Sequence, residues 1–245
     1  MKTNFFKYLC SPFYMFIMIM FFITESYFMK WLLMEMGSII LLSMMILHAT
    51  SKKKSLYSFV YLMMIQVMTA SLLLYFLMLK NYSSNEMFNS VMIYLIIFIK
   101  LGLFPFHYWY QYSINNLPWE LCFILSTIYK ILPLMFIYKI NIMEEEFMLM
   151  FCLISMFMSS IKALMSKNMK NIFTYSSIIN INYMMIMLHY DFSMMLIYFL
   201  MYIMATLYFC YFSNLYSLNY QFDYFMIDLF MYKMSIFINN MMLAG

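Results

Sequence analysis

The sequence predicts an all-α polytopic membrane protein with about nine transmembrane helices, at roughly 20 residues for each crossing of the bilayer. Of its 245 residues, 67% are hydrophobic and only 10% are charged. A soluble globular domain is about half apolar and a quarter charged. Disordered chains are poor in aromatic residues, which make up 22% of this chain. The apolar runs are long and continuous, whereas a β-barrel would show short alternating segments.

The apolar segments follow one another with short polar connections, and each is long enough to cross a membrane. They span residues 8–24, 27–48, 56–79, 88–106, 119–139, 147–165, 171–189, 193–214 and 222–243. No connection is long enough for a soluble domain. Residues 1–245 are therefore expected to form a single integral membrane domain.

The residue bias indicates the compartment. Met, Phe and Tyr number 35, 27 and 24, Gly and Pro number 3 and 4, and all 14 basic residues are Lys. This bias favours residues with AT-rich codons. The excess of Met is typical of a mitochondrial code that gives Met a second AT-rich codon. We therefore expect an organelle-encoded, multi-pass protein of the mitochondrial inner membrane.

Charges in the connections predict the orientation of the spans. If the spans alternate in direction, the side of the N-terminus receives Lys2, Lys7, Lys52, Lys53, Lys54, Lys162, Lys167 and Lys170. The opposite side receives only Lys80 and Lys139, together with most of the acidic residues. Basic connections stay on the inner side of the membrane, so the N-terminus is expected to face the matrix.

No cofactor or metal site is expected on this chain. Cys10, Cys122, Cys152 and Cys210 lie far apart, without the spacing of a zinc or iron–sulfur site. The sequence also lacks the G-x-G-x-x-G stretch of dinucleotide-binding proteins. The cysteines are expected to be small buried hydrophobic residues.

Three ionisable residues lie deep within the expected spans: Glu35, Lys100 and Lys130. Their depths are about 12, 18 and 16 Å at the rise of an α-helix. A lone charge near the bilayer centre is costly, so such residues are rare and usually face the protein interior. A buried Lys can release its proton, whereas Arg stays charged. Glu35 and Lys100 are therefore a candidate proton relay, and a purely structural ion pair is the alternative.

Two other lysines lie within the expected spans, and neither is assigned a role in proton transfer. Lys30 lies near the end of its span, where its side chain can reach the membrane surface. Lys233 lies deeper in the last span, and Asp228 is a possible partner five residues away, though not on the ideal helical face.

The fourth span contains a predicted helix break. Gly102 and Pro105 follow Lys100 closely, although the chain has only 3 Gly. Pro removes a backbone donor and interrupts the helical hydrogen bonds. Helices broken at mid-membrane occur where the loosened backbone lines a cavity or pathway. His107 follows directly and can extend a proton route; an interfacial His without such a role is the alternative.

Four stretches of the chain resemble the NADH dehydrogenase subunit 2 family, antiporter-like membrane subunits of respiratory complex I. Residues 100–109, KLGLFPFHYW, are similar to the family's K-L-G-x-x-P-F-H-F-W. Residues 127–133, TIYKILP, are similar to T-W-Q-K-x-A-P. Residues 175–178, YSSI, match part of A-Y-S-S-I, and residues 31–36, WLLMEM, resemble W-x-x-x-E-x-N. The four stretches occur in the family's order.

The resemblance implies an antiporter-like fold of inverted five-helix repeats, each with one broken helix. Residues 8–139 would form the first repeat and residues 147–245 an incomplete second one. It also implies that Glu35, Lys100, Lys130 and His107 take part in proton translocation, with Glu35 gating Lys100 and Lys130 linking onward.

By the same resemblance, the chain would be a core membrane subunit of the proton-pumping NADH:ubiquinone oxidoreductase. Its partners would be other membrane-arm subunits of complex I and inner-membrane lipids, and no nucleic acid. The complex uses NADH, flavin, iron–sulfur clusters and ubiquinone, but no redox chemistry is expected on this chain.

The sequence departs from the family pattern in its second half. Asn180 and Asn182 replace a histidine and a glycine after YSSI, and an Asn cannot titrate. Met241 to Gly245 resemble the start of the family's second break, G-G-L-P-P. The exit-side lysine and further helices are therefore expected beyond Gly245.

Two other functions are compatible with these residues. A freestanding cation/proton antiporter would use the same buried lysines but would run without NADH. A structural subunit of the complex, without its own proton path, would leave pumping intact when Lys100 is replaced.

Overall fold

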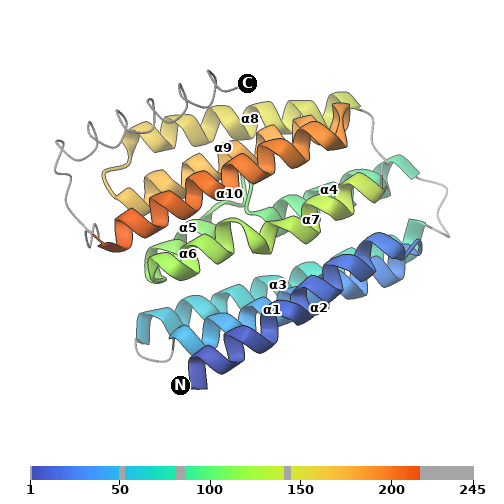
Figure 1. The fold of residues 1–245 in the computed structure, drawn as a ribbon. Coiled ribbons are helices and arrows are strands. Elements are labelled where there is room, and N and C mark those ends of the chain that lie inside the picture. The colour runs from blue at the N-terminus through green and yellow to red at the C-terminus, as the bar shows by residue number, and fades with distance from the viewer. Residues whose placement is uncertain (1, 50–52, 81–85, 141–144, 216–245) are drawn as a thin grey trace.

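The computed structural model describes residues 2–49, 53–80, 86–140 and 145–215, which form three stacked layers of helices (Figure 1). The first layer holds α1 (Lys2–Ile23), α2 (Tyr27–Ala49) and α3 (Lys53–Lys80). The middle layer holds α4 (Glu86–Leu101), α5 (Tyr108–Asn116), α6 (Trp119–Ser126) and α7 (Ile128–Ile140). The third layer holds α8 (Glu145–Met165), α9 (Met169–Tyr190) and α10 (Phe192–Leu215).

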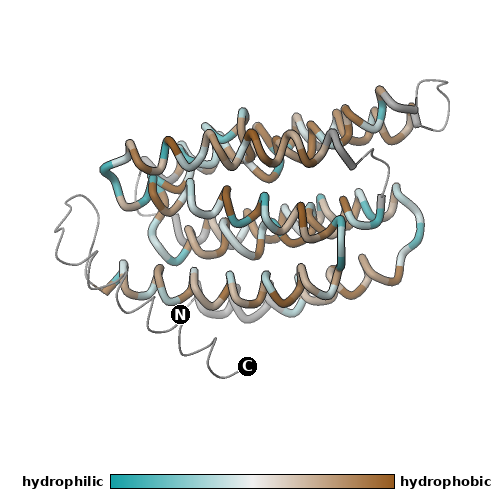
Figure 2. Tube along the Cα trace, turned by 90° about the horizontal axis from the view of Figure 1, so that it is seen from above, coloured by the Kyte–Doolittle hydropathy of each residue, from teal (hydrophilic) through white to brown (hydrophobic). Residues whose placement is uncertain are grey.

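All regular structure in the described residues is helical, as their long apolar runs predict. Figure 2 shows hydrophobic residues along the length of the helices and hydrophilic residues at several turns between them. Four helical stretches of this part are long and apolar enough to cross a membrane: Leu56–Leu79, Trp119–Lys139, Met148–Met165 and Phe192–Leu215. Pro12–Ile23 and Phe88–Leu101 are shorter apolar helices. The chain is an all-α membrane protein.

The middle layer forms the interior of the protein. In the stretch Trp119–Lys139, 72% of the most apolar segment is buried inside the protein. The corresponding share is 22% to 33% in the other three membrane-length stretches. Helices α2 and α3 pack against the middle layer from one side, and α9 and α10 pack against it from the other. Several polar side chains of this layer are buried, among them Ser113, Ser126 and Lys130.

The helix boundaries differ from the expected spans at two places in the middle layer. Residues 107–118, which connect two of the expected spans, belong for the most part to α5. The expected span 119–139 is divided into α6 and α7 at Thr127. The Thr127 hydroxyl donates to the Phe123 carbonyl at 2.7 Å, and such back-bonding often bends a helix.

The expected last span, residues 222–243, lies outside the described residues. Asp228 and Lys233, the possible pair within that span, lie outside them too.

The break between α4 and α5 is formed by a glycine in the left-handed conformation. Gly102 has a φ of 70°, a region that side-chain-bearing residues avoid. Its N–H donates to the Ile99 carbonyl at 3.1 Å, and the Leu103 N–H donates to the Phe98 carbonyl at 3.0 Å. These two bonds are the Schellman pattern of a helix C-terminus. The predicted break is thus present, and α4 ends one residue after Lys100.

Replacing Gly102 by Ala should destabilise the protein. An added Cβ would lie 2.8 Å from the Tyr110 Cβ, and the left-handed backbone costs about 1–2 kcal/mol for a residue with a Cβ. The measurement is the thermal unfolding midpoint of the chain in detergent, which should fall.

Gly37→Ala is the matched control. Its added Cβ would meet the end of the flexible Leu132 side chain, and its backbone is helical. It should lower the midpoint less than Gly102→Ala. Equal midpoints for the two variants would contradict the role assigned to the Gly102 conformation.

Candidate functional site

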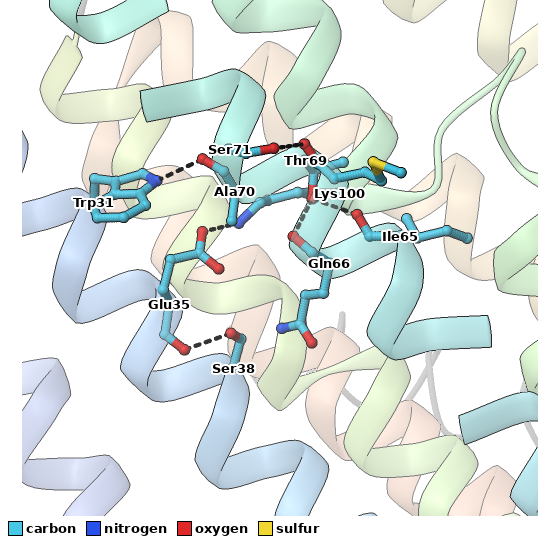
Figure 3. A network of polar contacts seen from close by, with 10 residues as sticks. Trp31, Glu35, Ser38, Ile65, Gln66, Thr69, Ala70, Ser71 and Lys100 are labelled. Atoms are coloured by element: carbon cyan, nitrogen blue, oxygen red, sulfur yellow. Dashed lines mark hydrogen bonds and ion pairs between the residues drawn. The ribbon is translucent and has the colours of Figure 1, made fainter. Parts of the chain in front are cut away.

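A buried ion pair joins the first two layers. Lys100, in the last turn of α4, pairs with Glu35 of α2 (Figure 3). Only 4% of the Lys100 side chain and 15% of the Glu35 side chain are exposed. Removing a charge from water costs several kcal/mol unless an opposite charge compensates for it. Each of these two charges therefore depends on the other.

One hydrogen bond joins α2 to α3 beside this pair, and others lie within each helix. The Trp31 indole N–H donates to the Ala70 carbonyl of α3 at 3.1 Å (Figure 3). Ser38 donates to the Glu35 carbonyl at 2.6 Å, and Thr69 donates to the Ile65 carbonyl at 2.9 Å. The Trp31, Ser38 and Thr69 side chains thus donate to backbone carbonyls and not to the Glu35 carboxylate, which pairs with Lys100.

A small pocket adjoins the ion pair. Its lining residues are Met34, Ser38, Leu41, Gln66, Lys100, Tyr129, Leu132 and Pro133. It leaves about 10 Å³ for the centre of a water molecule, which is room for about one water. The Gln66 side chain is buried, and its Nε2 has no hydrogen-bond partner among the described residues. A water in this pocket would satisfy that donor and lie beside Lys100.

Lys130 lies in a different environment from Lys100. Its side chain is 1% exposed, and its ammonium has no hydrogen-bond partner in the described part of the chain. The ammonium lies 3.6 Å from the centroid of the Tyr110 ring. A desolvated cation–π contact contributes about 2 kcal/mol, but a ring supplies no acceptor for a proton. Lys130 is therefore held by an aromatic face and by no carboxylate of the described residues.

The Tyr110 ring connects Lys130 to the third layer. The Tyr110 hydroxyl lies 2.7 Å from the Ser177 hydroxyl of α9, and Ser177 donates to the Thr174 carbonyl at 2.7 Å. Tyr202 of α10 donates to the Ser126 carbonyl at 3.2 Å. Polar groups thus continue from the middle layer towards α9 and α10.

His107 is also buried, directly after the helix break. It is 1% exposed, and its Nδ1 lies 3.2 Å from the Pro105 carbonyl. Its Nε2 lies 2.6 Å from the ammonium of Lys162 in α8. The structure therefore places His107 on Lys162 rather than on Lys100 or Lys130.

The two asparagines that replace a histidine and a glycine of the family pattern have separate surroundings. Asn180 accepts a hydrogen bond from the Tyr198 hydroxyl at 2.8 Å. Asn182 is buried and donates to the Ile178 carbonyl at 3.0 Å, while its Oδ1 has no partner among the described residues. Both are bonded within the third layer, and neither can carry a proton.

Sequence reasoning missed three residues of this site: Gln66, Tyr110 and Lys162. Gln66 was detectable, because it is a polar residue in the middle of an apolar span. Lys162 is expected at the end of its span, and only the fold shows that it reaches His107. Tyr110 carries no signal, because the chain has 24 Tyr.

The arrangement holds titratable groups at three places in the interior: the Glu35–Lys100 pair, Lys130, and the His107–Lys162 pair. Such groups can bind and release protons away from bulk water. Within the described residues, no group of three or more His, Cys, Asp or Glu could hold a metal ion.

Comparisons with known proteins find relatives along the whole chain. The chain is 30% identical over 111 residues to NADH-ubiquinone oxidoreductase chain 2 of Apis mellifera ligustica, covering 45% of this chain and 33% of that protein. The protein of the same name from Anopheles gambiae is 30% identical over 178 residues, which cover 72% of this chain and 52% of that protein. That of Artemia franciscana is 29% identical over 243 residues, covering 98% and 74%.

The Apis and Anopheles matches thus span about a third and about half of those relatives. The profile of the NADH:quinone oxidoreductase/Mrp antiporter transmembrane family matches residues 5–245. This chain belongs to that family.

Proposed function

We propose that this chain is a core membrane subunit of the proton-pumping NADH:ubiquinone oxidoreductase of the mitochondrial inner membrane, and that it contributes a proton-translocation path. The buried Glu35–Lys100 pair beside the break of α4 is the observation that carries this proposal. The relatives named NADH-ubiquinone oxidoreductase chain 2 support it. Electron transfer takes place on other subunits, and this chain meets other membrane-arm subunits and lipids.

Lys100 is the group that holds the proton in this proposal. While Glu35 remains in contact, its carboxylate stabilises the ammonium. When that contact weakens, the ammonium is left desolvated and gives its proton to a neighbouring acceptor. The break after Leu101 supplies the movable backbone that such a change needs.

Lys130 receives the proton next. Helices α4 and α7 pack together, and Tyr129, which precedes Lys130, lines the pocket beside Lys100. One water in that pocket would begin the transfer. Beyond Lys130, the Tyr110 and Ser177 hydroxyls are hydrogen-bonded to each other and lie towards α9, but the Lys130 ammonium contacts the Tyr110 ring and not its hydroxyl. His107 stands at the other end of the break.

The finer architecture is part of the same proposal. It includes about nine transmembrane spans, an N-terminus on the matrix side, and inverted repeats over residues 8–139 and 147–245. The lysine distribution supports the orientation, and the glycine break supports the broken helix of the first repeat. No cofactor is assigned to this chain.

Experiments can distinguish two other functions from the proposed one. A freestanding cation/proton antiporter is favoured by the antiporters in the family's description, and it would transport without NADH. A structural subunit would leave pumping unchanged when its buried lysines are replaced.

Lys100→Gln should abolish proton pumping through this chain, because Gln cannot carry a proton. It should also destabilise the chain by about 3–5 kcal/mol, the usual cost of leaving one buried charge of a pair alone. The measurement is protons pumped per NADH oxidised by the assembled complex in lipid vesicles, normalised to the amount of complex.

The double variant Glu35→Gln/Lys100→Gln separates charge loss from misfolding. It removes both charges, so stability should recover while pumping stays lost. Lys139→Gln is the matched control at an exposed lysine near the end of α7. Normal pumping by Lys100→Gln would contradict the proposal and favour a structural subunit.

Lys130→Met should separate stability from function. Lys130 has no hydrogen-bond partner in the described residues, and Met is a flexible apolar side chain that fills the space without a buried charge. The thermal midpoint should stay unchanged or rise, while protons pumped per NADH should fall. A loss of stability as large as that of Lys100→Gln would show that Lys130 has a structural role instead.

A further inference from the structure

Two basic side chains meet at the end of the helix break. The Lys162 Nζ and the His107 Nε2 lie 2.6 Å apart, which is hydrogen-bonding distance. The His107 Nδ1 lies 3.2 Å from the Pro105 carbonyl. A hydrogen on Nδ1 can donate to that carbonyl, which leaves Nε2 as the acceptor of a Lys162 proton.

Aromatic rings surround this pair. The Lys162 ammonium lies 4.8 Å from the centroid of the Tyr108 ring and 5.4 Å from that of the Phe104 ring. The His107 ring lies 6.1 Å from the Tyr175 ring of α9. In the part of the chain that the structure describes, Lys162 forms no ion pair with a carboxylate. No acidic side chain of that part therefore neutralises the pair.

The short distance limits how many protons the pair can hold. If both groups were protonated, Nε2 would lose its role as acceptor, and two positive charges would lie 2.6 Å apart. Such charges repel strongly in a weakly polar interior. The favoured state has one proton that Lys162 and His107 share, and this proton can lie on either nitrogen.

The pair links buried His107 to the end of α8, at a point where Pro105 and Phe106 of the break are themselves exposed. Lys162 lies three residues before the end of α8, and the polar residues Lys167 and Asn168 of the connection that follows are exposed. His107, in contrast, is 1% exposed and directly precedes α5. One end of the pair is thus close to solvent at the α8–α9 connection, and the other is inside the protein.

We propose that Lys162 and His107 form a proton-exchange site. Protons pass through this site between the helix break and the aqueous phase at the α8–α9 connection. This proposal rests on the proton-translocating function proposed above. In the matrix-facing orientation of that connection, the site would serve proton uptake. Lys162 would then be a further residue that handles the transported proton.

The transfer is a simple proton relay. The Lys162 ammonium gives one proton to the His107 Nε2, which leaves a neutral amine and an imidazolium. The imidazolium then releases its Nδ1 proton to a water in the break, which leaves a neutral ring with its proton on Nε2, and that proton must return to Nδ1 before the next transfer. The amine takes a proton from water at the surface, so no other reactant is needed.

Lys162→Arg provides the decisive test. Arg keeps the positive charge and the hydrogen-bond donors but does not release its proton. A proton-exchange role predicts that protons pumped per NADH fall to the level of Lys100→Gln, since losing a positioned proton donor slows transfer by about 10²–10⁴-fold. A purely positional role predicts that Arg preserves pumping. The measurement uses the assembled complex in lipid vesicles.

Two further variants complete the experiment. Lys162→Met removes charge and proton together, and it should pump no better than Lys162→Arg. Lys167→Arg, at an exposed lysine of the α8–α9 connection, should pump normally. The amount of assembled complex is measured for each variant, so that a folding defect is recognised.

The outcomes distinguish this inference from the proposed function. Wild-type pumping by Lys162→Arg, together with lost pumping by Lys100→Gln, would overturn the exchange site alone. Wild-type pumping by both variants would overturn the proton path itself. Lost pumping by both, with normal pumping by Lys167→Arg, is the result that we expect.

Discussion

The rest of the site depends on the ion pair between Glu35 and Lys100. Neither charge is stable alone in the interior of a membrane protein, so α2 and α4 must bring the two together. The position of α4 in turn requires the helix to end just after Lys100, which Gly102 achieves in the left-handed conformation. The Trp109 indole donates to the Ile99 carbonyl at 2.8 Å, which gives this carbonyl of the last turn of α4 a second hydrogen bond besides that from Gly102. The break thus begins directly after the residue that pairs with Glu35.

The three buried or half-buried lysines of the site differ in the group that each contacts. Lys100 contacts a carboxylate, Lys130 contacts an aromatic face, and Lys162 contacts an imidazole nitrogen. A carboxylate holds a proton on an ammonium by charge, a ring holds the cation without accepting its proton, and an imidazole can accept it. A proton path needs such unequal sites, because a proton held equally firmly at every site would not move on.

Much of this site was predictable from the sequence, and the reason is physical. Glu35, Lys100 and Lys130 stand out because a charge in an apolar run is costly. Gly102 and Pro105 stand out because they are rare in this chain. The helix α5 and the interruption at Thr127 were missed, since they depend on local hydrogen bonds, such as that from the Thr127 hydroxyl to the Phe123 carbonyl, which hydrophobicity does not encode. The contact between His107 and Lys162 depends on how α8 packs, which no local pattern specifies.

The composition of the chain makes burial more informative than residue type. All 14 basic residues are Lys, so a lysine by itself says little about selection for proton transfer. Lys139 and Lys167 are exposed, and codon bias alone can account for lysines at such positions. Lys100 and Lys130, in contrast, are buried. Lys30 is buried too, but its ammonium donates to the Glu25 carbonyl at 3.1 Å near the start of α2. Lys130 differs from Lys30, because its buried ammonium lies over the Tyr110 ring and has no hydrogen-bond acceptor among the described residues.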